Sequence, residues 1–241
     1  MEKSKMLLVS LGQGAGNIVD GLLSKNSRYN GLFLNSSLFD IKPLKNANMD
    51  KNVYIYPGTD GSGRDRNKSK EMIKDNANAI GGLLRKYPIT EVIVVFTTMA
   101  GGTGSGAIKT FIQIAKKALP NAKVNVVAIL PSLKEDELAF KNTLECWNDI
   151  NSIMNLINDV KFVDNNKRNT YKEINNEVID SLDLSYNIMG IHADGNIDNK
   201  DSFRINTAEG SGLVLKLYDG LKDTKTAIDL AIQNSVFVQP D

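Results

Sequence analysis

Residues 92–106 read VIVVFTTMAGGTGSG, and this stretch decides the fold. Its first part, Val92 to Phe96, is apolar and rich in β-branched residues, which is typical of a strand buried on both faces of a parallel sheet. The strand pattern stops at a run of glycines, and apolar residues then recur at helical spacing from 104 to 119. A buried strand, a glycine-rich turn and a helix in this order indicate an α/β protein.

The same alternation continues in both directions along the chain. Apolar segments predict strands at 6–11, 31–34, 53–56, 91–97 and 123–130. Helical periodicity predicts helices at 17–23, 68–86, 104–119, 136–158 and 171–188. We therefore expect an α/β fold with a parallel sheet. Nearer the C-terminus, the sequence predicts a loop at 190–202, a strand at 213–218 and a short helix around 227–232.

Composition removes several classes of function. The chain has 241 residues, 41% of them hydrophobic, with 29 Lys plus Arg against 28 Asp plus Glu and a net charge of +1. That balance gives no basic surface for wrapping nucleic acid, and the sequence holds no apolar run long enough to span a membrane. Cys146 and His192 are the single cysteine and histidine, which excludes a disulfide framework, a zinc cluster and most nucleophile–histidine pairs. The N-terminus lacks the apolar stretch of a secretory signal, so we expect a cytoplasmic protein.

Three glycine-rich segments follow predicted strands. They are 12–17 (GQGAGN), 58–63 (GTDGSG) and 100–106 (AGGTGSG). Glycines let backbone N–H groups approach an anion closely, and the N-terminus of a following helix adds its dipole, so each segment could hold a phosphate. A single segment of this kind is as often a tight turn, but the carboxyl ends of parallel strands meet at one edge of a sheet. We therefore expect the three segments to converge on one nucleotide site.

Two common nucleotide motifs do not fit these segments. The dinucleotide fingerprint requires a glycine where Asn17 stands and an acidic residue at the end of the second strand, where the sequence has 35–37 (NSS). A P-loop requires Gly-Lys-Ser/Thr at the end of its loop, whereas Lys109 and Thr110 lie a full turn inside the predicted helix. Both interpretations are therefore rejected.

The unbroken GGTGSG at 101–106 resembles the signature of the tubulin/FtsZ superfamily of GTPases. Further segments match the family in order: 12–17 its first phosphate loop, 163–165 and Tyr171-x-x-x-Asn175 its base-reading segments, and 196–201 its Asn-x-Asp-x-x-Asp loop. Residues 35–37 and 61–66 depart from FtsZ and are similar to the TubZ group of plasmids and phages.

The resemblance covers residues 6 to about 205 and implies three parts of the chain. Residues 1–169 form the parallel-sheet nucleotide-binding domain, residues 170–192 a long connecting helix, and residues 193–241 the catalytic loop and a partial C-terminal domain. The long helix would connect the base pocket to the catalytic loop.

The resemblance also implies that the ligand is GTP or GDP with Mg²⁺. It assigns nucleotide contacts to Gly12, Gln13, Gly14, Ala15, Gly16, Asn17, Asn35, Gly61, Ser62, Gly63, Gly101, Gly102, Thr103, Gly104, Ser105, Gly106, Glu135, Asn165, Tyr171 and Asn175. An Asn side chain can both accept from guanine and donate to it, which suits Asn17, Asn165 and Asn175, and the Tyr171 ring can stack.

Several assignments within the site stay open. Glu135 is the ribose candidate with Glu137 as its alternative, and Ala139 stands near the place of an arginine of the family. Arg64 either adds a cation beside the phosphates or is a solvated loop residue, and the sequence favours the second. The metal ligands are unknown, although Asp60 or Asp65 could help hold Mg²⁺ through water.

The same resemblance gives Asp198 and Asp201 the catalytic role. They follow the long helix, far from their own nucleotide, so they would act on a neighbouring subunit in a head-to-tail filament. The implied function is partition of plasmid or phage DNA, with a DNA-bound adaptor protein of TubR type as partner and no direct contact with nucleic acid or membrane. The alternatives are an FtsZ-like cell-division GTPase and a nucleotide-binding scaffold without turnover.

Overall fold

A parallel sheet forms the centre of the molecule. The computed structural model describes residues 2–187, 197–215 and 223–239. The strands are β1 Met6–Leu11, β2 Asn30–Asn35, β3 Val53–Ile55, β4 Val92–Thr98, β5 Lys123–Leu130, β6 Asp159–Asp164, β7 Gly210–Ser211 and β8 Phe237–Val238. Their order is β3-β2-β1-β4-β5-β6-β7, and only β8, which pairs with β6, runs antiparallel.

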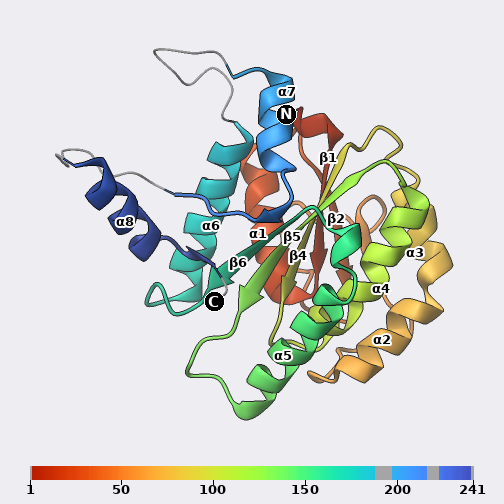
Figure 1. Cartoon of the computed structure of the whole chain (residues 1–241). Helices are drawn as coiled ribbons and strands as arrows, with labels where there is room; N and C mark the ends of the chain where they lie inside the picture. Colours follow the sequence, from red (N-terminus) through yellow and green to blue (C-terminus); the bar gives the residue numbers. More distant parts are fainter. Residues whose placement is uncertain (1, 188–196, 216–222, 240–241) are drawn as a thin grey trace.

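Helices cover both faces of the sheet (Figure 1). One face carries α1 Gln13–Lys25 and α6 Tyr171–Tyr186. The other carries α2 Arg66–Asp75, α3 Ala77–Leu84, α4 Thr103–Ala118 and α5 Glu137–Asn151. The remaining helices are α7 Asn199–Asn206, α8 Thr224–Asn234 and the 3-10 turns Lys3–Lys5 and Met154–Leu156.

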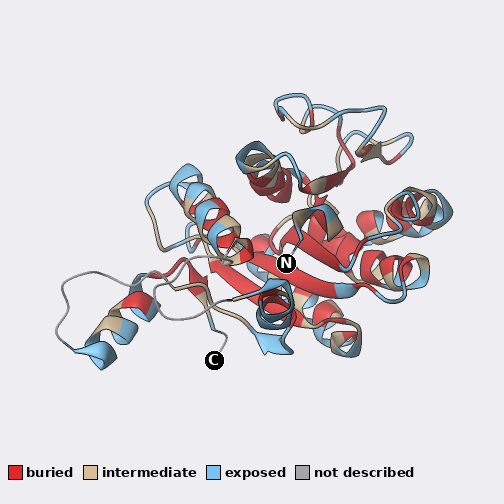
Figure 2. Ribbon diagram, turned by 90° about the horizontal axis from the view of Figure 1, so that it is seen from above, coloured by how far each residue is buried: buried red, intermediate tan, exposed pale blue. Residues whose placement is uncertain are grey.

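Alternation along the strands builds two cores. In β1, Leu7 and Val9 contact the core that contains Phe111 of α4, whereas Leu8 contacts the core that contains Val178 of α6. Successive side chains of a strand point to opposite faces, so a sheet covered on both sides needs apolar residues at every position. Figure 2 shows the sheet buried between helices whose outer faces are exposed. The α/β fold with a parallel sheet is therefore confirmed.

Two predicted helices have different bounds. The helix expected at 68–86 is two helices that meet at Asn76, whose side chain donates to the Met72 carbonyl at 2.8 Å and accepts from the Tyr54 hydroxyl at 2.7 Å. The helix expected to start at Asn17 begins at Gln13, because Gly12 (φ +84°) ends the strand abruptly. Such a positive φ favours glycine.

The helix expected at 136–158 ends at Asn151, and the strand that follows, β6, was not predicted. Asp159 and Lys161 occupy buried positions on β6 and pair with each other, while Val160 and Phe162 face the core beside α4 and α5. The alternation of charged and apolar residues from Asp159 to Phe162 is itself a strand pattern, but it lacks the continuous apolar run by which the other strands were predicted.

The C-terminal predictions are confirmed in part. The loop expected at 190–202 is wrong from Asn199 onward, where α7 begins, and 190–196 lies outside the described residues. Residues 213–215 of the expected strand are not in a strand, and 216–218 lie outside the described residues. The helix expected around 227–232 is found within α8. Along the parts of the chain that the structure describes, no helix combines the length and apolarity needed to cross a bilayer.

Candidate nucleotide site

A cavity of about 550 Å³ opens at the carboxyl ends of β1, β4 and β5. The strand order reverses between β1 and β4, which makes this edge the topological switch point where α/β sheets bind ligands. Of the predicted nucleotide residues, those that line the cavity are Gln13, Gly14, Asn17, Gly101, Glu135, Asn165, Tyr171 and Asn175. These side chains come from five separate parts of the sequence, and the fold brings them to one place.

The predicted base-contacting residues come from α1, α6 and the end of β6. A capping box fixes the start of α6, because the Thr170 hydroxyl accepts from the Glu173 N–H at 3.2 Å and the Glu173 carboxylate accepts from the Thr170 N–H at 3.1 Å. Tyr171 is therefore the first residue of the helix, and Asn175 follows one turn later on the same side. Tyr171 is 53% exposed and lines the cavity, so it is accessible to a planar ligand.

Glu135 lies in the cavity wall beside Tyr171. Its Oε1 accepts from the Ser132 N–H at 3.2 Å and from the Tyr171 hydroxyl at 3.4 Å. Burial and the Glu135 carboxylate raise the pKa of Tyr171, so its phenol stays protonated and able to donate at neutral pH. The alternative residue, Glu137, is exposed at the start of α5 and is not part of the lining.

The first and third glycine segments touch each other. A Cβ on Gly104 would lie 2.3 Å from the Leu11 carbonyl oxygen, and one on Gly12 would lie 3.4 Å from the Gly104 nitrogen. The second segment joins them through hydroxyl groups, since Thr103 Oγ1 lies 2.7 Å from Ser36 Oγ and donates to Ser62 Oγ at 3.1 Å. The three segments therefore lie together, but only the first and third contribute residues to the cavity lining.

Other predicted residues lie behind the cavity lining. Ser105 is fully buried and donates back to the Gly101 carbonyl, and a Cβ on Gly106 would lie 2.5 Å from the Arg66 carbonyl. Asn35 is 1% exposed, and its Oδ1 accepts from the amides of Ser36 and Ser37. Its Nδ2 has no hydrogen-bond partner among the described residues, so a donor is left over at the end of β2.

Arg64 is placed differently from the expectation of a solvated loop residue. It lines the cavity, and its guanidinium donates to both carboxylate oxygens of Asp136 at 2.8 and 2.9 Å. Its φ is +62°, a left-handed conformation that non-glycine residues rarely adopt. The sequence does not signal this position, because the partner on α5 is 72 residues away along the chain.

The two candidate metal residues, Asp60 and Asp65, differ in the hydrogen bonds that their carboxylates already accept. Asp65 caps α2, with Oδ1 accepting from the amides of Asn67 and Lys68. Asp60 accepts a single hydrogen bond from the described residues, from Ser37 Oγ at 3.3 Å. Its carboxylate therefore has more acceptor capacity left for a water or a metal ion. No cluster of three metal-ligating side chains occurs in the described ranges.

Helix α7, which Asp198 caps and which contains Asp201, lies at the other end of the sheet (Figure 1). Asp198 caps α7 by accepting from the amides of Lys200 and Asp201, and Asp201 accepts in return from the Asp198 N–H at 3.3 Å. Those two amides lower the pKa of Asp198, which is therefore ionised at neutral pH. The 16 residues of α6, roughly 24 Å of helix, separate the base pocket from this end.

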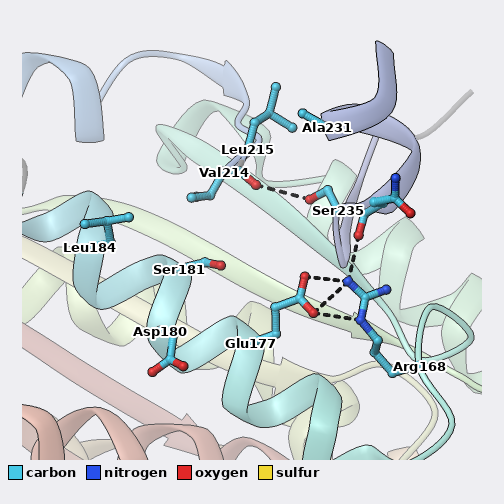
Figure 3. A pocket seen from close by; sticks show the side chains of 10 residues that line it. Arg168, Glu177, Asp180, Ser181, Leu184, Val214, Leu215, Ala231 and Ser235 are labelled. Carbon is cyan, nitrogen blue, oxygen red and sulfur yellow. Dashed lines mark hydrogen bonds and ion pairs between the residues drawn. The ribbon is translucent and has the colours of Figure 1, made fainter. Parts of the chain in front are cut away.

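A second cavity, of about 450 Å³, lies between α6 and α8 (Figure 3). Arg168 forms an ion pair with Glu177 at its edge and donates to the Asn234 carbonyl at 2.8 Å, which ties the start of α6 to the end of α8. None of the predicted nucleotide or catalytic residues lines this cavity.

Comparisons with known proteins support the resemblance. Residues 5–171 match the Tubulin/FtsZ family, GTPase domain. The chain is 32% identical over 240 residues to the tubulin-like protein TubZ of a Clostridium botulinum C phage, covering 98% of this chain and 66% of that relative, just under two thirds of its length.

Solved structures agree with this match. A C-terminal tail truncated TubZ of the Clostridium botulinum phage c-st superposes with a TM-score of 0.89 at 31% identity, over 99% of this chain and 77% of that one. A Bacillus thuringiensis serovar israelensis TubZ, solved as a GTPγS-form protofilament, shares the fold with a TM-score of 0.81 at 17% identity, over 98% of this chain and 70% of that one. The sequence match and the fold together lead to one conclusion: this chain belongs to the tubulin/FtsZ family and contains its GTPase domain.

Proposed function

We propose that the protein binds GTP in the cavity at the carboxyl edge of the sheet and hydrolyses it within a filament of its own copies. The observation that carries the proposal is the convergence of the first and third glycine segments with Asn17, Asn165, Asn175 and Tyr171 around one cavity at the switch point, with the second segment joined to the third through Ser62 and Thr103. Backbone amides suit the phosphates, and the planar side chains suit the base.

The base is proposed to lie against the face that carries α1 and α6. There, Asn side chains can accept from N1–H or N2–H of guanine and donate to O6, whereas adenine presents the reverse pattern. The phosphates then extend toward Gly101 and Arg64, which come from the opposite face of the sheet. Magnesium, where present, would neutralise phosphate charge, with Asp60 the candidate to hold it through water.

Hydrolysis is proposed to need a second subunit. Asp198 and Asp201 lie too far from their own cavity to act there, but a copy stacked head to tail would bring them to the next subunit's terminal phosphate. Phosphoryl transfer depends on positioning and charge, so carboxylates that orient a water can complete the site. The protofilament reported for the Bacillus thuringiensis relative supports this form of assembly.

The cellular role is proposed from the resemblance to the TubZ group. It is partition of plasmid or phage DNA in the cytoplasm, through a DNA-bound adaptor protein of TubR type. The net charge of +1 supports an adaptor in place of direct DNA binding. The same resemblance is the basis for dividing the chain into a nucleotide-binding domain (1–169), a connecting helix (170–192) and a C-terminal part (193–241).

The test is a phosphate-release assay over a range of protein concentrations. We expect the rate per molecule to rise steeply with concentration, with GTP and not ATP as substrate. Equal rates per molecule at all concentrations would contradict assembly-dependent turnover. Tight GTP binding without phosphate release at any concentration would instead identify a scaffold that has lost turnover.

A further inference from the structure

Asn142 joins two of the glycine segments from behind. It lies in α5 and is 4% exposed. Its Nδ2 donates to the Arg64 carbonyl at 3.0 Å and to the Ala100 carbonyl at 3.1 Å. Arg64 follows the second glycine segment and Ala100 opens the third, so one buried amide holds both segments against a helix that contributes no glycine loop.

The contact with Arg64 supports a strained backbone. A left-handed φ is unfavourable for an L-residue because Cβ crowds the following carbonyl oxygen, and Arg64 has φ +62°. Helix α5 holds this residue at two points, because Asp136 binds its guanidinium and Asn142 binds its carbonyl. Strained residues persist where their surroundings over-determine them, and this one lines the cavity.

The contact with Ala100 sets the direction of an amide. All peptide bonds of the described chain are trans, so the N–H of Gly101 points opposite to the Ala100 carbonyl. Since that carbonyl accepts from Asn142, the Gly101 N–H points away from α5. Gly101 lines the cavity, and no backbone carbonyl among the described residues accepts from its N–H. This donor is available to a ligand.

We propose that Asn142 is a positioning residue that sets the distance between the second and third glycine segments for the terminal phosphate of the nucleotide. The inference rests on the proposed function. Arg64 and Gly101 come from the face of the sheet opposite α1 and α6, so a nucleotide with its base at Asn175 reaches them with the end of its phosphate chain. Loss of the Asn142 amide therefore weakens binding of a triphosphate more than binding of a diphosphate.

The test compares GTP and GDP affinities of the full chain with those of Asn142→Leu, a change of similar volume without donors. We expect GTP affinity to fall about tenfold, the equivalent of roughly 1.4 kcal/mol, and GDP affinity to stay within about threefold. Asn148→Leu is the matched control, because Asn148 lies on the same helix and is exposed. The control should change neither affinity.

Asn142→Ser covers the case in which the leucine variant does not fold. Its hydroxyl has one proton and a shorter reach, so it cannot serve both carbonyls. The proposal is overturned if either folded variant binds GTP as the parent does, or loses GTP and GDP affinity equally. A parent chain that binds neither nucleotide would refute the proposed function itself, which is a separate result.

Discussion

The two ends of the sheet are built in opposite ways. At the carboxyl end, residues from distant parts of the sequence form the cavity, and contacts such as Arg64–Asp136 and Asn142–Ala100 hold its walls. At the other end, Asp198 and Asp201 are held by four residues of local sequence, the capping box of α7. The first arrangement depends on tertiary packing and the second mainly on one helical turn.

This difference has a consequence for function. A change at Asp198 disturbs only the start of α7, so it should leave the cavity intact, whereas a change in the cavity wall propagates through several segments. The α7 end is still anchored to the sheet, because Asn206 accepts from Asn125 of β5 and contacts Ser185 at the end of α6. If Asp198 and Asp201 act on a neighbouring subunit as proposed, the chain presents two half-sites that can be altered separately.

The largest effect is expected from Asp198→Ala. If this carboxylate acts on the neighbouring subunit, GTP hydrolysis should fall by about 10²- to 10⁴-fold while GTP affinity is unchanged. Mixing the variant with parent protein should lower turnover below the value for parent alone, because mixed filaments contain inactive contacts. Steady-state phosphate release and an equilibrium GTP titration measure the two quantities.

Asp223→Ala is the matched control for that experiment. Asp223 caps α8 by accepting from the Thr226 N–H at 2.8 Å, so both variants lose an exposed helix cap, worth about 0.5–2 kcal/mol. Hydrolysis that falls equally in the two variants would mean that the cap, and not the Asp198 carboxylate as a catalytic group, explains the loss.

The next effect concerns the cavity end. Asn175→Ala should lower GTP affinity about tenfold and leave the much weaker ATP affinity unchanged, because only guanine uses the amide as proposed. Asn176→Ala is the control, since Asn176 is the next residue of α6 and is exposed. Competition titrations of both nucleotides measure the effect. Equal affinities of the parent chain for GTP and ATP would refute the base assignment.

A smaller effect is expected at Arg64, where the guanidinium is proposed to support GTP binding and the left-handed backbone lowers the stability of the fold. Arg64→Gly removes the guanidinium but relieves the left-handed strain, while Arg64→Ala removes the guanidinium and keeps the strain. Both should weaken GTP binding several-fold. In thermal unfolding without nucleotide, the glycine variant should be the more stable of the two by about 1 kcal/mol. Equal Tm values would show that the left-handed backbone carries no cost.

The features that the sequence predicts well are local. A β-branched run that ends in glycines identifies β4 and its loop, and parallel strands oblige such loops to meet at one edge. The convergence of 12–17, 58–63 and 100–106 was therefore predictable. The start of α1 also depends on a local feature, the glycine at position 12, but the apolar periodicity placed it at Asn17 instead of Gln13.

Most features that the sequence does not predict depend on partners far along the chain. β6 is an exception, because the two charged residues that interrupt its apolar pattern, Asp159 and Lys161, are neighbours on the strand and pair with each other. Arg64 acquires its place from Asp136 on α5. For Asn142 a signal exists, because it falls at helical spacing with the buried residues Ala139, Cys146 and Ile150 of α5. A polar residue in such a stripe needs a buried partner, which the sequence alone cannot name.

The smallest effect is expected from Asp136→Asn, which separates charge from capping. Asn caps a helix as well as Asp does, so the bond to the Ala139 N–H can be kept, while the charge that faces Arg64 and one of the two acceptors for its guanidinium are lost. The Arg64 hydrogen bonds lower the pKa of Asp136 in the folded state. A carboxyl with a depressed pKa stabilises the fold above its ordinary pKa, and this contribution is lost as the pH falls through the folded value. The parent should therefore be slightly more stable than the variant at pH 7. The difference should begin to shrink near pH ~4, the ordinary pKa of aspartate, and vanish only below the lowered folded-state pKa. Because the Arg64–Asp136 pair is exposed, 0.5 M salt should also reduce the stability difference between parent and variant at pH 7, since dissolved ions screen surface ion pairs. A difference in Tm that persists at low pH would mean that the carboxylate acts through packing or capping, and that Arg64 is held in the cavity wall by Asn142 and not by Asp136.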